Sequence, residues 1–282
     1  MNKEGDLSTF DKNWKNRKES MYNHWSSGAP KNQIQFAFYN HWKTFSSIMN
    51  NSRLFNKGKK VLEVGAGRGS LSAYFSENGY QTTLLDTSEK ILQTAKEIFN
   101  QNKLNAEYVL GNALSLPFKN DSFDIVFSIG LLEHFDNIID PISEQIRVLT
   151  KGGIWIGYIV PEMENNVQKE YKWVNEILKT YHKDTYNEVP KEVVYRTSYN
   201  SSDYIKVLKE LNVRDINFSG IYSVPMISHS IDFPFSLMSS QAEEVLVSRF
   251  VEIFNQRKKT GYENPWLCEE NYGNALLVWG VK

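Results

Sequence analysis

The sequence predicts an α/β fold in which helices cover both faces of a doubly wound, mostly parallel β-sheet. Two observations lead to this fold class. Strand-like segments alternate with amphipathic helical segments from residue 59 to residue 160, and the strands are nearly continuous runs of Val, Ile and Leu, as strands covered on both faces are. With 282 residues, of which 41% are hydrophobic, the chain can fill the core of one enlarged domain.

We expect residues 1–58 to form an N-terminal arm and lid helices that precede the main domain, residues 59–282. Residues 1–20 are polar. After Pro30, large apolar side chains recur every three or four positions, which is the spacing of an amphipathic helix. The apolar stripe of this helix consists of Ile34, Phe38, Trp42, Phe45 and Met49.

The first strand of the main domain ends in the turn "VGAGRGS", which contains Gly65, Gly67 and Gly69. The elements predicted after the turn are a helix, the strand "QTTLLD", a helix behind the cap candidate Ser88, the strands "AEYVLGN" and "FDIVFSIG", a helix with Asp140 at its cap and Pro141 at its first position, and the strand "IWIGYIV". Lys151, Gly152 and Gly153 end the last of these helices.

Beyond Pro161 the alternation loosens, and we expect two insertions that form a helical cap over a pocket, at about residues 161–200 and 222–270. A helix "NSSDYIKVLKELN" with serine cap candidates, the strand "VRDINFSGIY" and a final strand "GNALLVWGVK" complete the predicted sheet. The first insertion carries a helical stripe of Met163, Val167, Tyr171, Val174, Leu178 and Tyr181, expected to pack in the core, and the second a helix with Leu246, Phe250 and Phe254.

Composition narrows the class of partner. The net charge is −1 and the pI is about 6.5, so a polyanion such as a nucleic acid or an acidic membrane surface is not attracted at long range. Cys268 is the single cysteine, the five histidines are scattered, and no run of 18 apolar residues is present. We therefore expect a cytoplasmic protein with a small-molecule partner and no metal site, nucleic acid or membrane, and the sequence predicts no oligomeric state.

Three ligand classes use a glycine turn that joins a strand to a helix: nucleoside triphosphates, dinucleotides and adenosyl sulfonium compounds. A triphosphate loop needs Gly-Lys-Ser/Thr, but Ser70 follows Gly69 directly. A dinucleotide turn counted from Gly65 needs its third glycine at position 70, so the spacing disfavours NAD.

Polar residues at two further strand ends favour adenosine. Asp86 ends the second strand, 21 residues after Gly65 (86 minus 65), where a carboxylate can accept hydrogen bonds from both ribose hydroxyls. Asn112 and Ala113 follow the third strand, and the side-chain carbonyl of Asn112 can accept from an adenine amino group. Together with the turn, these residues describe a cradle without a cationic phosphate contact.

The segments "VLEVGAGRGSLS", "LLDTSEKILQTAKE", "GNALSLPFKNDSFDIVFSIGLLEH" and "IRVLTKGGIWIG" resemble the successive motifs of class I S-adenosylmethionine-dependent methyltransferases of the small-molecule type. The resemblance covers about residues 59–160. It implies a Rossmann-like, seven-stranded sheet with its last strand antiparallel, and S-adenosylmethionine as cofactor. Asn112 stands where the family usually has aspartate, and Thr150-Lys151 replaces the usual lysine-proline pair.

The resemblance also implies the residues that bind the donor. Glu63 and Gly65 are expected to hold its methionine part, Asp86 the ribose, and Asn112 and Ala113 the adenine. The segment "MYNHWSSGAP" resembles the N-terminal lid of small-molecule members, although its aromatic residues can equally anchor the arm. The donor-binding residues expected in all are Tyr22, Trp25, Glu63, Gly65, Ala66, Gly67, Asp86, Thr87, Asn112, Ala113, Ser128, Ile129 and Gly130.

His134 is the candidate general base, with Glu133 beside it, because "LLEH" follows the fourth strand where the methyl group would project. A histidine bonded to neighbouring backbone is the alternative. Aromatic and charged residues of the insertions are candidates for the acceptor site, or simply pack the insertions. These candidates are Tyr181, Tyr195, Arg196, His229 and Trp266.

The function expected is transfer of a methyl group to an oxygen or nitrogen of a small metabolite. Three alternatives remain open: a methyltransferase acting on protein side chains, a non-catalytic module that binds S-adenosylmethionine, and a dehydrogenase. The sequence does not identify the acceptor.

Overall fold

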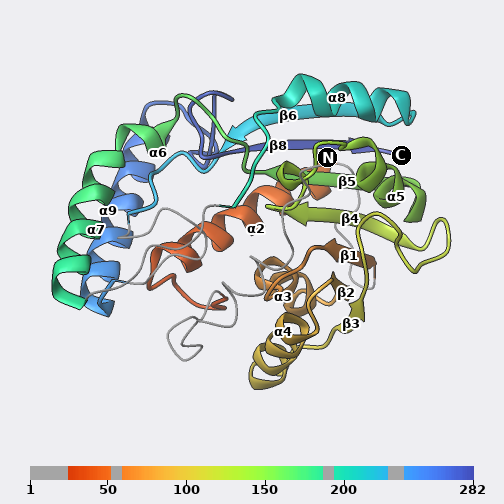
Figure 1. Cartoon of the computed structure of the whole chain (residues 1–282), viewed down its shortest axis with the longest axis horizontal. Coiled ribbons are helices and arrows are strands. Elements are labelled where there is room, and N and C mark those ends of the chain that lie inside the picture. The colour runs from red at the N-terminus through yellow and green to blue at the C-terminus, as the bar shows by residue number, and fades with distance from the viewer. Residues whose placement is uncertain (1–24, 52–58, 187–193, 228–237) are drawn as a thin grey trace.

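The computed structural model describes residues 25–51, 59–186, 194–227 and 238–282. Within these residues, one sheet of eight strands runs through the molecule in the order β3-β2-β1-β4-β5-β8-β6-β7 (Figure 1). The strands are β1 Lys60–Val64, β2 Gln81–Asp86, β3 Glu107–Leu110, β4 Phe123–Ile129, β5 Leu149–Ile159, β6 Arg214–Ile221, β7 Leu267–Cys268 and β8 Ala275–Val281.

The pairing confirms the mostly parallel sheet with an antiparallel last strand. β3, β2, β1, β4 and β5 pair in parallel, whereas β8 pairs antiparallel with both β5 and β6. The sheet has eight strands where seven were expected, because the two-residue strand β7 pairs with Gly220 and Ile221 of β6. So short a strand leaves no alternating pattern in the sequence.

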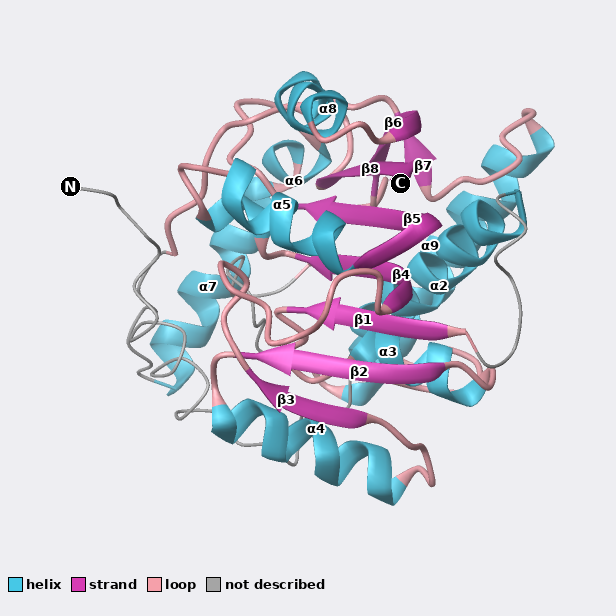
Figure 2. Cartoon of the chain, turned by 90° about the vertical axis from the view of Figure 1, so that its right-hand side faces the viewer, coloured by secondary structure: helices cyan, strands magenta, loops and turns pink. Residues whose placement is uncertain are grey.

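Helices cover both faces of the sheet, as predicted (Figure 2). Neighbouring residues of β1 belong to different apolar clusters, Val61 to one and Leu62 to the other, because successive side chains of a strand point to opposite faces. The helices α2 Gln33–Asn51, α3 Ser70–Glu77, α4 Glu89–Gln101 and α9 Ser240–Lys259 contribute to the first cluster, and α5 Ile139–Val148 and α8 Ser201–Glu210 to the second.

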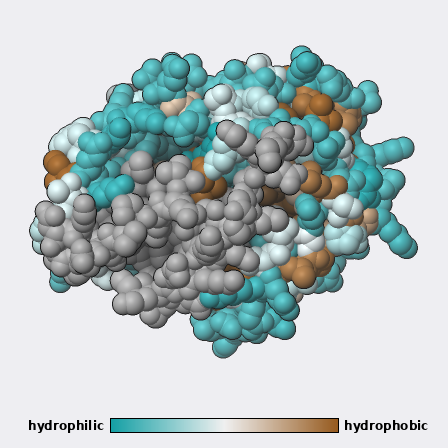
Figure 3. Space-filling model, viewed as in Figure 1, coloured by the Kyte–Doolittle hydropathy of each residue, from teal (hydrophilic) through white to brown (hydrophobic). Residues whose placement is uncertain are grey.

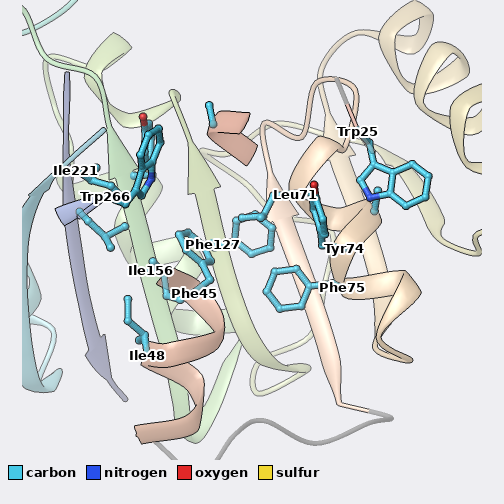
Figure 4. Packing of buried hydrophobic residues seen from close by; sticks show 14 of the residues in the cluster. Trp25, Phe45, Ile48, Leu71, Tyr74, Phe75, Phe127, Ile156, Ile221 and Trp266 are labelled. Carbon is cyan, nitrogen blue, oxygen red and sulfur yellow. The ribbon is translucent and has the colours of Figure 1, made fainter. Parts of the chain in front are cut away.

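The first cluster is rich in aromatic rings. Figure 4 shows Phe45 of α2 and Phe75 of α3 around Phe127 of β4, where the rings of Phe75 and Phe127 stack with centroids 5.2 Å apart. Phe45 meets the same ring edge-on at 5.6 Å. The helix predicted after Pro30 is therefore α2, and its apolar stripe packs on the sheet.

The segments predicted as cap insertions contain α6 Val167–Glu170, α7 Lys172–Tyr186 and α9. Figures 1 and 2 place α6 and α7 on the side to which the arrowheads of the parallel strands point. The predicted stripe was wrong in part: the helix breaks at Tyr171, and Tyr171 and Tyr181 are 39% and 67% exposed. The spacing of apolar residues identifies which side chains share a face of the helix, but not which of them are covered by the rest of the protein.

Three predicted helix ends differ from the structure. α5 ends at Val148, so Lys151, Gly152 and Gly153, which were predicted to end it, lie in β5. α5 begins at Ile139, so Asp140 lies inside its first turn, and the Ile139 N–H is satisfied by Asn137 Oδ1 at 3.1 Å. α8 begins after Asn200, whose side chain accepts from the Ser202 N–H, so the cap is asparagine and not serine. Asn and Ser have nearly equal preference for this position, which is why the sequence does not separate them.

Figure 3 shows that the described surface on this face of the molecule is mostly hydrophilic, with separate hydrophobic spots. Among the described helices, none is both long and apolar enough to cross a membrane.

Candidate functional site

The predicted glycine turn lies between β1 and α3, at the carboxyl end of β1. Gly65, Gly67 and Gly69 have positive φ angles of 69°, 53° and 68°, a region that residues with a Cβ rarely adopt. The main-chain N–H groups of Gly65 and Ala66 both donate to the carbonyl of Leu85 in β2, each at 2.9 Å. The turn is thereby fixed to the end of the neighbouring strand.

Asp86 lies beside this turn, as expected from parallel pairing of β1 and β2. One carboxylate oxygen accepts from the Gly67 N–H at 2.9 Å and the other from the Ser88 N–H at 3.0 Å. Each oxygen retains further acceptor capacity. Thr87, also expected to bind the donor, is exposed next to Asp86. The ribose contact of Asp86 stays a prediction.

Glu63 is buried at the end of β1 on the same edge of the sheet. Its carboxyl accepts from the Ser72 hydroxyl of α3 at 2.5 Å. Burial raises the pKa of Glu63 to about 8, and the hydrogen bonds from Ser72 oppose this shift only in part. A cation placed beside Glu63 would favour its ionised form. Ser72 was missed in the sequence, because a serine inside a helix carries no motif.

Arg68, between Gly67 and Gly69, was also missed. It is buried, so the turn carries a cationic side chain, although the sequence predicted a cradle without a cationic phosphate contact. The segment "GAGRGS" shows the arginine, but the sequence gives no sign that its side chain is buried.

The predicted adenine site follows β3. Asn112 is exposed, and its side-chain oxygen accepts from the Leu114 N–H at 2.9 Å, which forms a tight turn. Ala113 is buried behind it. The oxygen of Asn112 therefore has one established partner and capacity for a second, and the contact with adenine stays a prediction.

The end of β4 completes this edge of the sheet. Ser128 is buried and its hydroxyl has no hydrogen-bond partner among the described residues. Ile129 ends the strand, and Gly130 has a positive φ of 62° while its N–H donates to the Tyr158 carbonyl at 2.9 Å. A Cβ on Gly65 would lie 2.9 Å from the side chain of Leu131, so the two turns are in close contact.

The candidate base lies in the short helix η2, Leu132–His134, directly after β4. His134 Nδ1 lies 2.6 Å from the main-chain oxygen of Tyr195, and its Nε2 lies 3.8 Å from Glu133 Oε1. A carbonyl only accepts, so Nδ1 carries the proton and the neutral ring has its lone pair on Nε2. Glu133 is buried, and its Oε2 has no hydrogen-bond partner within the described part of the chain. His134 is thus bonded to the backbone through Nδ1, while its Nε2 lies near the carboxyl group of Glu133.

Of the two predicted lid aromatics, Tyr22 lies outside the described residues. Trp25 is buried against α3, where its ring meets Tyr74 edge-on with centroids 6.2 Å apart (Figure 4). The Tyr74 hydroxyl donates to the Ser26 carbonyl at 2.9 Å. Trp25 therefore anchors the N-terminal segment, and its indole N–H has no partner in the described structure. Contact of Trp25 with a donor stays a prediction.

The acceptor candidates that the structure describes are not gathered in one place. Trp266 is fully buried in the core and donates from Nε1 to His41 Nδ1 at 3.0 Å, which argues against the acceptor contact expected of it. Tyr181 is exposed on α7, and His229 lies outside the described residues. Tyr195 does lie next to His134, since the carbonyl of Tyr195 is its partner, and Arg196 follows Tyr195 in the chain.

The chemistry of this edge fits a cationic adenosyl donor. Two acids, Glu63 and Asp86, flank the turn, where they can accept from an ammonium group and from ribose hydroxyls. Ser70 and not lysine follows Gly69, so this turn lacks the Gly-Lys-Ser/Thr sequence of a triphosphate loop. Within the described residues, no three His, Cys, Asp or Glu side chains are arranged to hold a metal ion.

Comparison with known proteins agrees with this geometry. Residues 62–157 match a family described as "Methyltransferase domain". The ubiquinone/menaquinone biosynthesis C-methyltransferase UbiE of Shewanella pealeana is 33% identical over 126 residues, which are 43% of this chain and 49% of that protein. The malonyl-[acyl-carrier protein] O-methyltransferase of Enterobacter lignolyticus is 30% identical over 95 residues, 34% of this chain and 36% of that protein. The chain thus spans about half or less of these relatives.

A solved structure shares the fold. The phosphoethanolamine N-methyltransferase 2 of Haemonchus contortus, in complex with S-adenosylhomocysteine, superposes with a TM-score of 0.53 at 17% identity, covering 86% of this chain and 52% of that chain. At this identity the similarity concerns the fold alone. The three proteins carry C-, O- and N-methyltransferase names, so the acceptor atom varies among proteins that resemble this chain.

Proposed function

Since its matched domain makes this chain a member of the class I S-adenosylmethionine-dependent methyltransferases, we propose that it transfers a methyl group to an oxygen or nitrogen of a small-molecule metabolite. The observation that most supports this proposal is the glycine turn flanked by two acids, with the His134–Glu133 pair on the adjacent strand end. Glu63, Asp86 and the main chain of the turn would hold the donor.

The residues of η2 supply the remaining chemistry. When bound, S-adenosylmethionine supplies an electrophilic methyl carbon and a sulfur that keeps the electron pair of the broken C–S bond. His134 Nε2 takes the proton that the acceptor atom loses as it bonds to that carbon, and the carboxylate of Glu133 stabilises the imidazolium formed. The partly buried position of His134 limits the access of water to this proton.

A carbon acceptor is the second candidate, favoured by the C-methyltransferase name of the UbiE relative. It requires the same proton removal, so His134 would have the same role. A protein side chain as acceptor and a module that binds the donor without turnover are further alternatives.

The test is to incubate the full chain with S-adenosylmethionine and a metabolite extract and to search for products heavier by one methylene group. Formation of such a product supports the proposal. Tight donor binding in calorimetry without any methylated product identifies a binding module, and saturable binding of NADH in place of the donor identifies a dehydrogenase. If S-adenosylmethionine with a labelled methyl group labels a polypeptide and no metabolite, the acceptor is a protein.

His134→Ala tests the role of the base. We expect turnover to fall about 10²-fold or more, the usual contribution of a general base, while the calorimetric affinity for the donor stays near wild type. Turnover equal to wild type would assign His134 a purely structural role.

A further inference from the structure

One segment of the first insertion is bonded to the candidate catalytic turn. We call residues 195–199 the strap. The Thr197 N–H donates to the Glu133 carbonyl at 2.7 Å, and the Tyr195 carbonyl accepts from His134 Nδ1. Both main-chain contacts join the strap directly to the Glu133–His134 pair, although about 60 residues separate them in the sequence.

The strap contains neither helix nor strand, and main-chain bonds hold its middle, because the Thr197 carbonyl also accepts from the Glu162 N–H at 2.8 Å. Side chains hold its two ends. The Tyr195 hydroxyl donates to Asp136 Oδ1 at 2.5 Å, the short distance typical of a bond to an ionised carboxylate. The Tyr199 hydroxyl donates to the main-chain oxygen of Asp136 at 2.8 Å. Asp136, two residues after His134, is therefore the point at which both ends of the strap are attached.

The bond between Tyr195 and Asp136 fixes the carbonyl that His134 uses. Tyr195 contributes its hydroxyl to Asp136 and its main-chain oxygen to His134, so a single residue bridges the two. The Asp136 carboxylate also holds the pKa of the Tyr195 phenol above its usual value, because the hydrogen bond requires the protonated phenol. The phenol thus remains a donor across the ordinary working range of pH.

The direction in which His134 presents its lone pair follows from this arrangement. With Nδ1–H bound to the carbonyl, the lone pair is on Nε2, next to Glu133 Oε1. If the carbonyl moved away, both neutral tautomers would be populated, and the fraction with a basic Nε2 would fall. Burial raises the pKa of Tyr158 and of Tyr204, and the nearby Glu133 adds to both shifts.

We propose that Asp136 and Tyr195 are positioning residues that hold His134 in the tautomer with Nε2 as the proton acceptor. This inference rests on the proposed function only for the catalytic step. In that step the acceptor atom X forms a bond to the methyl carbon, the electron pair of the broken C–S bond stays on sulfur, and the proton of X–H goes to Nε2. The tautomer itself is a property of the chain without any ligand. The charged and titratable groups described around the Glu133–His134 pair are Asp136 on the same segment, Tyr195 on the strap, Tyr158 of β5 and Tyr204 of α8.

The first test measures the tautomer by ¹⁵N NMR of the histidine rings, with His134→Gln used to assign the His134 signals. In the neutral ring of the wild-type chain we expect Nδ1 to be protonated and Nε2 to be unprotonated. In Tyr195→Phe, which removes only the hydroxyl that reaches Asp136, we expect the two tautomers to be mixed. Tyr262→Phe, at an exposed phenol, is the matched control and should leave the spectrum unchanged.

The second test uses turnover. Loss of one charge-assisted hydrogen bond should lower kcat about tenfold in Tyr195→Phe and in Asp136→Ala, with KM for the donor unchanged, and Asp136→Asn should recover part of the loss because its oxygen still accepts. If Asp136→Ala does not fold, Tyr195→Phe, which deletes a single oxygen, carries the test.

A wild-type spectrum with Nε2 protonated and Nδ1 unprotonated would overturn the inference, as would an unchanged tautomer ratio in Tyr195→Phe. The expected spectra without any methylated product would support the positioning role and count against the proposed function. A methylated product together with the opposite tautomer would support the proposed function and overturn the positioning role. Failure of the inference and failure of the proposed function are therefore distinguishable.

Discussion

Glu63 is a buried acid whose pKa, about 8, lies well above its usual value of 4.5 because burial disfavours the charged form. The folded chain therefore binds a proton at Glu63 that the unfolded chain has lost. The stability that this provides is present below pH 4.5 and declines as the pH rises toward 8. Glu63 is thus expected to make the protein less stable in mildly alkaline solution.

We predict that Glu63→Gln flattens the dependence of stability on pH. Urea denaturation of the wild type should show a lower free energy of unfolding at about pH 9 than at about pH 6, and the variant should lose most of this difference. The variant should also bind the donor more weakly, because an amide cannot balance an ammonium group. Parallel pH curves for both proteins would refute the burial argument.

Asp86→Ala is predicted to weaken binding of S-adenosylmethionine by ~1–3 kcal/mol, since it removes the acceptor for two main-chain N–H groups and, under the proposed function, for the ribose hydroxyls. Calorimetric titration measures this change. Asp124 supplies the matched control, because it accepts from the Lys60 N–H at the opposite end of β1. Asp124→Ala should leave donor affinity unaltered, and equal losses in the two variants would mean that Asp86 acts only through stability.

At the scale of elements, the glycine turn depends on the absence of a side chain at Gly69. A Cβ at this position would lie 2.3 Å from the side chain of Leu84 and 3.0 Å from that of Phe99, and φ is positive. Gly69→Ala should therefore destabilise the chain by ~1–3 kcal/mol through overpacking, in addition to backbone strain.

Thermal denaturation checks this prediction for Gly69. The control is Gly28→Ala, where a Cβ would meet nothing within 4 Å. We expect the control to unfold at the wild-type temperature. A Gly69→Ala protein as stable as the control would show that β2 and α4 yield readily to the added methyl group.

His41 joins α2 to the segment before β7, because it accepts a hydrogen bond from Trp266 and its ring meets Tyr158 with centroids 4.6 Å apart. Burial lowers the pKa of His41 from 6.5 to about 3. The neutral ring contributes stability above pH 6.5, and this contribution is lost as the pH falls toward 3, the opposite sign to Glu63.

His41→Phe should be less stable than wild type at neutral pH by ~1–3 kcal/mol, since the indole N–H of Trp266 loses its acceptor inside the core. It should also lose less stability on acidification, because no buried imidazole has to remain neutral. Urea denaturation at about pH 7 and about pH 5 measures both effects. An acid dependence equal to that of the wild type would contradict the assigned pKa shift.

For the whole molecule, a buried set of hydrogen bonds links α2 with α9. The Gln33 N–H and side-chain amide donate to the two carboxylate oxygens of Glu243 at 2.9 and 3.2 Å. The same amide donates to the Ile227 carbonyl at 2.7 Å and accepts from the Ile227 N–H at 3.0 Å. Residues about 200 positions apart are thereby held at one point.

Gln33→Ala should cost at least about 2 kcal/mol of unfolding free energy, because it leaves the buried carboxylate of Glu243 without its amide partner. Urea denaturation gives the value. Gln93→Ala, in which the exposed glutamine bonds only Glu97 on the surface of α4, should change stability by less than about 0.5 kcal/mol. Similar effects of the two substitutions would show that α2 and α9 do not depend on this link.

The sequence predicted local features better than long-range contacts. The three glycines and Asp86 were identifiable because strand period, glycine conformation and spacing are local properties. Trp266 was placed in the acceptor site because an aromatic residue in an insertion carries no sign of the face it occupies. The partnership of His134 with Tyr195, and the role of Asp136, could not be predicted, because they depend on how a long insertion returns to the sheet.

The position of β8 bears on how the polypeptide is made. β8 lies between β5 and β6, yet it is the last of the three to be synthesised. Among the described residues, β6 pairs with β8 along most of its length and with the two residues of β7 at one end. A growing chain can complete the five parallel strands while it is still attached to the ribosome, whereas β6 must wait with an open edge until residues 275–281 emerge. Shielding of that edge during translation is then a requirement for efficient production of the protein.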